Sequence, residues 1–214
     1  MSLLKDIATL GQLPALLRLK KGMTPRPEDV KDCFGARVEA NAANLGTQSA
    51  IVCEGKELNW IEFNGLSNQY ANAFKAQGLG RGDTVCTMME HRIEVLALLV
   101  GLNKLGVTAG LLNTNLTGRS LKHCISVIEA KKCIFGAEVI AAVAEVQGEL
   151  ELATGTDFLF VSDASCDDVS RPEWALDLDT LQQAAEAVNP PETGDNTIGQ
   201  TALYIYTSGT TGLP

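Results

Sequence analysis

Residues 83–112 read DTVCTMMEHRIEVLALLVGLNKLGVTAGLL, and this stretch decides the fold. Residues 83–89 form a short apolar run that predicts a buried strand, and residues 107–112 form a second one. Between them, residues 91–105 predict a helix that is apolar nearly all round, so we expect it to be covered on both sides. A strand, a helix and a second strand in this order predict a βαβ unit with parallel strands.

The same alternation continues on both sides of this stretch. Downstream, the sequence predicts helices over 117–130, 138–150 and 178–188, and strands over 132–136, 157–162 and 201–206. Upstream, it predicts a helix over 30–44, a hairpin over 49–60 and a helix over 61–77 that Gly78 ends. The predicted fold class is therefore α/β, with βαβ units forming a mostly parallel sheet between flanking helices.

Composition limits the classes of function. The 214 residues are 45% hydrophobic, which can supply a proper core, and the net charge is −9 with a pI near 4.7. This acidity argues against a general nucleic-acid binder, which needs a basic face. The cysteines show no CxxC and no regular spacing, so we expect reduced, mostly buried thiols rather than a zinc site or a disulfide framework. They are Cys33, Cys53, Cys86, Cys124, Cys133 and Cys166.

Residues 1–22 form an amphipathic, basic leader. Leucines recur at helical spacing from Leu3 to Leu19, beside basic residues, and Pro14 shortens the helix. The favoured interpretation is a helix docked on the parent domain; the alternative is a segment lying on an anionic membrane. The sequence has no secretory signal and no apolar run of about 18 to 20 residues. The expected location is cytoplasmic, with peripheral membrane contact through this leader as the second interpretation.

The last residues, 204–214, read YIYTSGTTGLP and follow a predicted strand. Their hydroxyl side chains can donate hydrogen bonds to phosphate, and their glycines let backbone N–H groups approach an anion. The candidate ATP-phosphate residues are Thr207, Ser208, Gly209, Thr210, Thr211 and Gly212. The run is not a Walker A loop, and a linker can have the same composition.

The string YTSGTTGLP resembles the nucleotide signature of the adenylate-forming (AMP-binding) superfamily, in which a Lys follows the final Pro. Residues 58–116 are similar to the amino-terminal sequence of that family. Together with NTNLTGRSLKHCI, the terminal run most resembles the fatty acid transport protein branch, which are long-chain and very-long-chain acyl-CoA synthetases. The chain stops at Pro214, before the expected Lys.

This resemblance implies a ligase that activates a fatty acid with ATP to an acyl adenylate and then to acyl-CoA, with Mg²⁺ as counter-ion and coenzyme A as co-substrate. The predicted organisation is a leader at 1–22 and a connector and helix at 23–48, both read from the residues, followed by a partial adenylate-forming domain at 49–214, which the resemblance implies. Because other catalytic parts of the family lie downstream, we expect this chain to be inactive alone and to hold no complete catalytic set. Two rivals stay open: a non-catalytic lipid-binding or membrane-docking module, and an adenylation relative for another carboxylic acid.

Other polar residues receive structural interpretations. We expect His123 to be packed or hydrogen-bonded and His91 to lie at a helix start. Asn113 and Asn115 are expected to form a turn. The acidic residues after the 157–162 strand are expected to lie in a solvated loop without metal-ligand spacing, and Arg119 is only weakly indicated as a phosphate or partner contact. These acidic residues are Asp163, Asp167 and Asp168.

Overall fold

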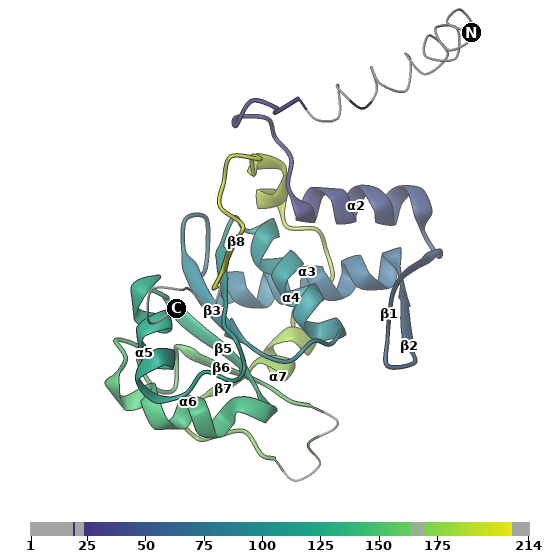
Figure 1. The fold of residues 1–214 in the computed structure, drawn as a ribbon. Helices are drawn as coiled ribbons and strands as arrows, with labels where there is room; N and C mark the ends of the chain where they lie inside the picture. Colours follow the sequence, from purple (N-terminus) through teal and green to yellow (C-terminus); the bar gives the residue numbers. More distant parts are fainter. Residues whose placement is uncertain (1–18, 20–23, 164–165, 167–168, 207–214) are drawn as a thin grey trace, which may run out of the picture.

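The computed structural model describes residues 19, 24–163, 166 and 169–206, and its centre is a six-stranded sheet (Figure 1). Every pair of neighbouring strands in this sheet is parallel, as predicted. In spatial order the strands are β7 (Leu176–Asp177), β6 (Phe158–Val161), β5 (Lys132–Gly136), β3 (Thr84–Met88), β4 (Thr108–Leu111) and β8 (Leu203–Ile205).

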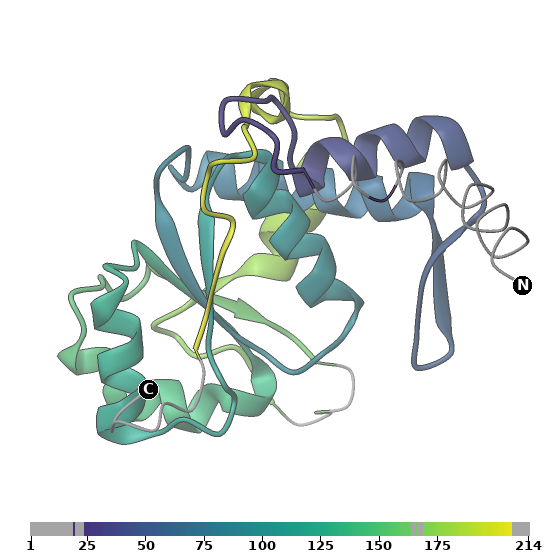
Figure 2. The same cartoon turned by 45° about the horizontal axis from the view of Figure 1, so that its top comes forward.

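The order of the strands explains where the helices lie. The chain runs from β3 through α4 (Ile93–Lys104) to β4, and α5 (Gly118–Val127) then returns it to β5 on the other side of β3. Because such crossovers are right-handed, reversing their direction sends the helices to opposite faces of the sheet. One face carries α3 (Trp60–Ala76), α4 and α7 (Leu178–Gln183), and the other carries α5 and α6 (Ile140–Val146) (Figures 1 and 2).

Alternation along the strands divides the core between these two faces. In β6, Leu159 and Val161 belong to the apolar cluster under α3 and α4. Phe158 and Phe160 belong to the apolar cluster under α5 and α6. In that cluster the rings of Trp174 and Phe158 pack edge to face, with their centroids 5.2 Å apart. A strand buried on both faces reads as a continuous apolar run, which is why the sequence predicts these strands well.

The amino-terminal part adds a helix and a hairpin outside the main sheet. Helix α2 (Phe34–Leu45) is followed by β1 (Ser49–Cys53) and β2 (Lys56–Asn59), which form the predicted antiparallel hairpin. Its turn residues Glu54 and Gly55 both have positive φ, as a type I′ turn requires. Helix α3 begins at Trp60 because Asn59 and Glu62 form a reciprocal capping box.

Short elements account for the differences from the predicted boundaries. The two-residue strand β7 was not predicted, and neither were the 3₁₀ turns η1 (Ala137–Val139), η2 (Gln147–Glu149) and η3 (Pro191–Asp195). Helix α6 is therefore shorter than the predicted 138–150, and α7 ends at Gln183 rather than near 188. Helix α2 starts at Phe34 rather than at 30 because Val30 and Asp32 bond to residues 196–198 instead.

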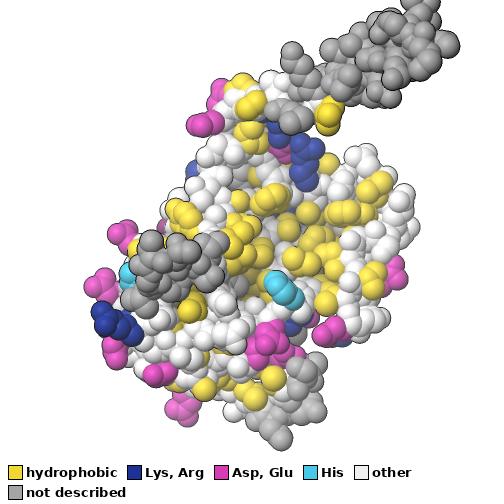
Figure 3. Space-filling model, in the orientation of Figure 1, with side chains coloured by type: hydrophobic (Ala, Val, Ile, Leu, Met, Phe, Trp, Pro, Cys, Tyr) yellow, Lys and Arg dark blue, Asp and Glu magenta, His cyan; other side chains and the backbone are white. Residues whose placement is uncertain are grey.

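Helix α4 is covered on most of its surface, as predicted. Helices α2 and α3 and strand β4 pack against it, and Leu96, at 45%, is the single exposed residue between Ile93 and Lys104. Hydrophobic side chains gather across the middle of the face drawn in Figure 3. No described helix combines the length and apolar character needed to cross a bilayer. Of the leader 1–22, only Leu19 lies within the described residues.

The cysteines agree with the prediction of reduced thiols. Cys86, Cys124 and Cys133 are buried, and the other three are partly buried. Cys86 and Cys133 face each other in register on β3 and β5. The hydrogen bond of the Cys86 thiol to the Cys133 side chain, together with burial, raises the pKa of Cys86, so this thiol stays protonated.

Candidate functional site

The candidate site is the edge of the sheet where the parallel strands end, which we call the carboxyl edge. The connections that follow β3, β4, β5, β6 and β8 all leave from this edge. Ligands of open α/β sheets usually bind there, where the direction of the crossovers changes. In this chain the direction changes at β3, which has β4 on one side and β5 on the other.

Strand β8 carries the chain to this edge. It pairs in parallel with β4, and Thr108 Oγ1 donates a hydrogen bond of 2.9 Å to Thr201 O just before the strand begins. One residue past the strand, Tyr206 Oη donates to Cys124 O at 2.5 Å on α5. Burial raises the pKa of Tyr206 to about 12, so its hydroxyl remains a donor at neutral pH.

The predicted phosphate-binding residues lie outside the described residues. They are Thr207, Ser208, Gly209, Thr210, Thr211 and Gly212. Their neighbour Tyr206 is described, and its position immediately after a parallel strand is the position that the sequence predicts for the start of such a loop.

A turn follows β4 at the same edge. Asn113 Oδ1 accepts hydrogen bonds from the backbone N–H of Asn115 at 2.9 Å and from Asn115 Nδ2 at 3.1 Å. This side-chain-to-backbone contact is typical of an Asx turn. The interpretation of these two residues as turn formers is confirmed.

A charged cluster joins the connections that follow β3, β5 and β6. Arg92 Nη1 lies 3.1 Å from Glu138 Oε2 and 2.9 Å from Asp163 Oδ2, and its side chain is only 12% exposed. Glu138 Oε1 also accepts from the backbone N–H of Glu90 at 2.6 Å. A Cβ on Gly136 would lie 2.2 Å from Glu138 Oε2, so the glycine gives the carboxylate room to reach Arg92.

Asp163 therefore differs from its prediction as a solvated carboxylate, because it is ion-paired and its side chain is 17% exposed. Asp167 and Asp168 lie outside the described residues. The pairing of Arg92 with Glu138 was not predicted, since it joins loops 46 residues apart. A sequence signal does exist: each residue follows the end of an apolar strand, and such ends meet at one edge of a parallel sheet.

The carboxylates of this cluster do not offer a magnesium site. Glu138 and Asp163 are both held by Arg92. Within 24–163 and 169–206, together with residues 19 and 166, no three His, Cys, Asp or Glu side chains are arranged to hold a metal ion. The described residues alone therefore do not fit a magnesium ion, and an ion that arrives with nucleotide would need other ligands.

The remaining candidates lie at the surface. His91 and His123 are both exposed, so the prediction that His123 is packed or hydrogen-bonded is wrong. His91 lies two residues before α4, as predicted for a helix start. Arg119 is exposed in the first turn of α5, and no described contact assigns it a partner.

A parallel sheet covered on both faces, with a change in crossover direction at β3, defines the class as the open α/β proteins that bind ligands at the carboxyl ends of their strands. The chain belongs to the AMP-binding enzyme family, which matches residues 38–214.

Two relatives of known name are similar to this chain in sequence. The chain is 40% identical over 171 residues to long-chain fatty acid transport protein 1 of Bos taurus, covering 77% of this chain and 25% of the relative. It is 29% identical over 215 residues to the medium/long-chain-fatty-acid–CoA ligase FadD6 of Mycobacterium tuberculosis, covering 98% and 33%. The chain thus spans between a quarter and a third of the length of these relatives.

Solved structures share the fold. The anthranilate CoA ligase AuaEII, solved with anthranoyl-AMP, matches with a TM-score of 0.77 at 20% identity, over 88% of this chain and 34% of that one. A fatty acyl CoA synthetase of Mycobacterium tuberculosis matches with a TM-score of 0.68 at 20% identity, over 85% and 34%. The predicted family and fold class are confirmed.

Proposed function

We propose that this chain supplies the first nucleotide-binding part of an enzyme that activates a fatty acid with ATP, first to an acyl adenylate and then to acyl-CoA. One structural observation carries the proposal. Strand β8 lies parallel in the sheet and ends at the carboxyl edge, directly before the Ser/Thr/Gly run at 207–212. The names of the relatives, which include fatty acid transport proteins and a fatty-acid–CoA ligase, support this substrate class.

The proposed reaction has two balanced steps. The fatty carboxylate attacks the α-phosphorus of ATP and pyrophosphate leaves; the thiolate of coenzyme A then attacks the acyl carbon and AMP leaves. The first step needs donors that hold the leaving pyrophosphate in line. In our proposal the hydroxyl groups of 207–211 and the N–H groups of Gly209 and Gly212 supply these donors, and Mg²⁺ shares the phosphate charge.

A binding experiment tests the proposed phosphate site. Equilibrium dialysis with ATP and Mg²⁺ would compare the 214-residue chain with its Ser208→Ala variant, and with Ser170→Ala as a control for loss of an exposed hydroxyl. We expect Ser208→Ala to weaken binding about tenfold, since it loses a hydrogen bond to a charged group, and the control to bind as the parent does. Equal affinities of the two variants, or no binding by the parent, would contradict the proposal.

We also propose that the 214-residue chain does not complete the reaction alone, since these relatives are about three times as long. A pyrophosphate-exchange assay with palmitate should then stay at background. Clear exchange would refute this. Substitution of benzoate for palmitate in an active, longer form would separate long-chain activation from that of another acid.

Peripheral membrane contact through 1–22, for a protein located in the cytoplasm, is a separate proposal supported by the leucine periodicity and basic residues of that segment. Co-sedimentation with vesicles of anionic lipid should detect binding that deletion of 1–22 abolishes. Replacement of Lys20 and Lys21 by Gln should weaken the binding without removing the leucines. Vesicle binding that persists after the deletion would exclude this role for the leader.

A further inference from the structure

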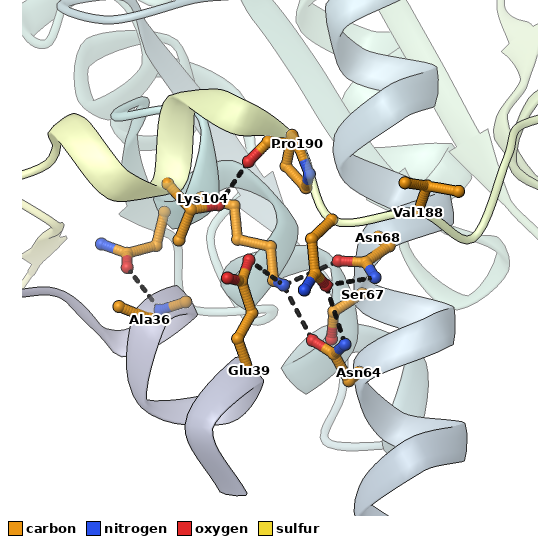
Figure 4. Close-up of polar contacts among 12 residues, drawn as sticks. Ala36, Glu39, Asn64, Ser67, Asn68, Lys104, Val188 and Pro190 are labelled. Atoms are coloured by element: carbon orange, nitrogen blue, oxygen red, sulfur yellow. Dashed lines mark hydrogen bonds and ion pairs between the residues drawn. The ribbon is translucent and has the colours of Figure 1, made fainter. Parts of the chain in front are cut away.

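Lys104 is a fully buried lysine in the last turn of α4, with no exposed side-chain surface. Its ammonium donates to three acceptors: Glu39 Oε1 at 2.8 Å, Asn64 Oδ1 at 2.8 Å and Asn68 Oδ1 at 2.6 Å (Figure 4). An ammonium has three donors, so all of them are used. Helix α2 reaches this site because Gly35 leaves room for the lysine stem; a Cβ there would lie 2.4 Å from Lys104 Cγ.

The ammonium decides which way two amides of α3 face. Because Asn64 and Asn68 turn their oxygens toward Lys104, their Nδ2 groups face the other way. Both Nδ2 groups donate to Asn189 Oδ1, at 2.9 Å and 2.7 Å, and Asn68 Nδ2 also lies 3.0 Å from Ala187 O. The charge of Lys104 on α4 thereby orients two amide donors of α3 toward residues 187–189.

Residues 187–189 belong to the stretch 184–200, which we call the connecting segment because it joins α7 to β8. Lys104 contacts this segment directly through its backbone. Asn196 Nδ2 donates to both Asn103 O and Lys104 O at 2.8 Å, which satisfies carbonyls at the end of α4. Lys104 therefore acts on the connecting segment at two points, through Asn64 and Asn68 at residues 187–189 and directly at Asn196, and β8 begins three residues after the end of the segment.

A buried ammonium is costly, and burial lowers the pKa of Lys104 despite Glu39 beside it. An apolar side chain at this position would avoid the cost of taking a charge out of water. It could not orient the two asparagines, however. The charge therefore contributes orientation and not merely packing.

We propose that Lys104 is a positioning residue for β8 and, through β8, for the phosphate-binding run at 207–212. It acts by fixing the Asn64 and Asn68 amides against the connecting segment. The extension to the phosphate-binding run rests on the proposed function, whereas the positioning of β8 does not.

Hydrogen exchange of the 214-residue chain tests the positioning of β8. The reporters are backbone amides that are bonded in residues 193–205, and the reference is the sheet centre at 84–88 and 132–136. Asn68→Asp keeps an acceptor for Lys104 but removes the donor to Ala187 and Asn189. We expect exchange at 193–205 to rise about tenfold or more, as for the loss of hydrogen bonds in a buried network, with the reference unchanged.

Two further variants distinguish a specific effect on the position of β8 from a general destabilisation of the connecting segment. Asn72→Asp removes two hydrogen bonds to the same segment, to Glu186 O and Val188 O, but has no contact with Lys104. It should leave exchange at 201–205 within about threefold of the parent. Lys104→Met should reproduce the Asn68→Asp pattern, and the double variant should exchange no faster than the faster single variant, because coupled residues are not additive.

The outcomes are distinct. Additive effects of Lys104→Met and Asn68→Asp, or unchanged exchange at 201–205 in Asn68→Asp, would overturn the positioning role. An Asn72→Asp variant that matches Asn68→Asp would also overturn it. Dialysis with ATP and Mg²⁺ then tests the extension to nucleotide: weaker binding by Asn68→Asp supports it, and equal binding overturns it. If the parent chain binds no ATP, the proposed function fails while the exchange measurements still decide the role of Lys104.

Discussion

Helix α4 crosses α3 so closely at Gly101 that a methyl group there should destabilise the protein. A Cβ on Gly101 would lie 2.9 Å from both Ala71 N and Ser67 O, which are backbone atoms of α3 and cannot rotate away. Gly101→Ala therefore forces the two helices apart, at a cost of about 1–3 kcal/mol for an overpacked core. Against this, alanine in place of glycine favours a helix by about 1 kcal/mol.

Gly65, in the middle of α3, provides the matched control. A Cβ there would have its nearest neighbour at 3.9 Å, so Gly65→Ala gains the helix preference without a clash. We expect Gly65→Ala to raise the free energy of unfolding by about 0.5–1 kcal/mol. Since the helix preference is common to both variants, the difference between them measures the steric term, about 1–3 kcal/mol.

Urea unfolding followed by far-ultraviolet circular dichroism would measure both variants beside the parent, and equal m-values would show that the same surface is exposed in each case. A Gly101→Ala variant that is stabilised as much as Gly65→Ala would refute the close crossing of α3 and α4.

Three other predictions address the core and the charged groups. Leu98→Ala, at a fully buried position, should lower the free energy of unfolding by about 2–5 kcal/mol in the same urea assay. Gly136→Ala should displace the Glu138 carboxylate, which loses its ion pair with Arg92 and the hydrogen bond from the Glu90 N–H, at a cost of about 1–3 kcal/mol; a variant as stable as the parent would contradict the described cluster. Hydrogen bonding from Arg37 lowers the pKa of Asp32 from 3.8 to about 2, so this pair stabilises the fold above pH 3.8 and is lost as the pH falls toward 2. Asp32→Asn should therefore melt below the parent at pH 6, with a gap that narrows by pH 3; a constant gap would argue against the pair.

The strands of the sheet could be predicted because burial on both faces leaves a plain signal. The apolar runs at 132–136 and 157–162 correspond to β5 and β6 within a residue. The end of α7 could not be predicted in this way, since the sequence after Gln183 still has helical spacing. There Asn72 and Asn68 of α3 bind the carbonyl oxygens of 186–188, and these tertiary contacts replace the next helical turn.

The candidate site could be predicted only in part, because some of its contacts also depend on tertiary structure. The turn at Asn113 is local in sequence, so it could be recognised from the residues alone. The Ser/Thr/Gly run is equally local, and its role in binding phosphate stays a prediction. The burial of Lys104 depends on three helices at once. A signal was nevertheless present: Lys104 follows Gly101 by three positions, which places it on the face of α4 that packs against α3.

The late position of β8 has a consequence for how the protein folds during synthesis. The hydrogen bond between Thr108 and Thr201 joins residues that are 93 positions apart. Among neighbouring strands of the described sheet, β4 and the edge strand β8 are therefore the pair that lies farthest apart in the sequence. Strands β3 to β6 and their helices can associate while the ribosome is still adding the residues that follow. Closing so long a loop is slow, so docking of β8 is expected to be among the last steps. The proposed phosphate-binding run, which follows β8 in the chain, would then be joined to a sheet that has already folded.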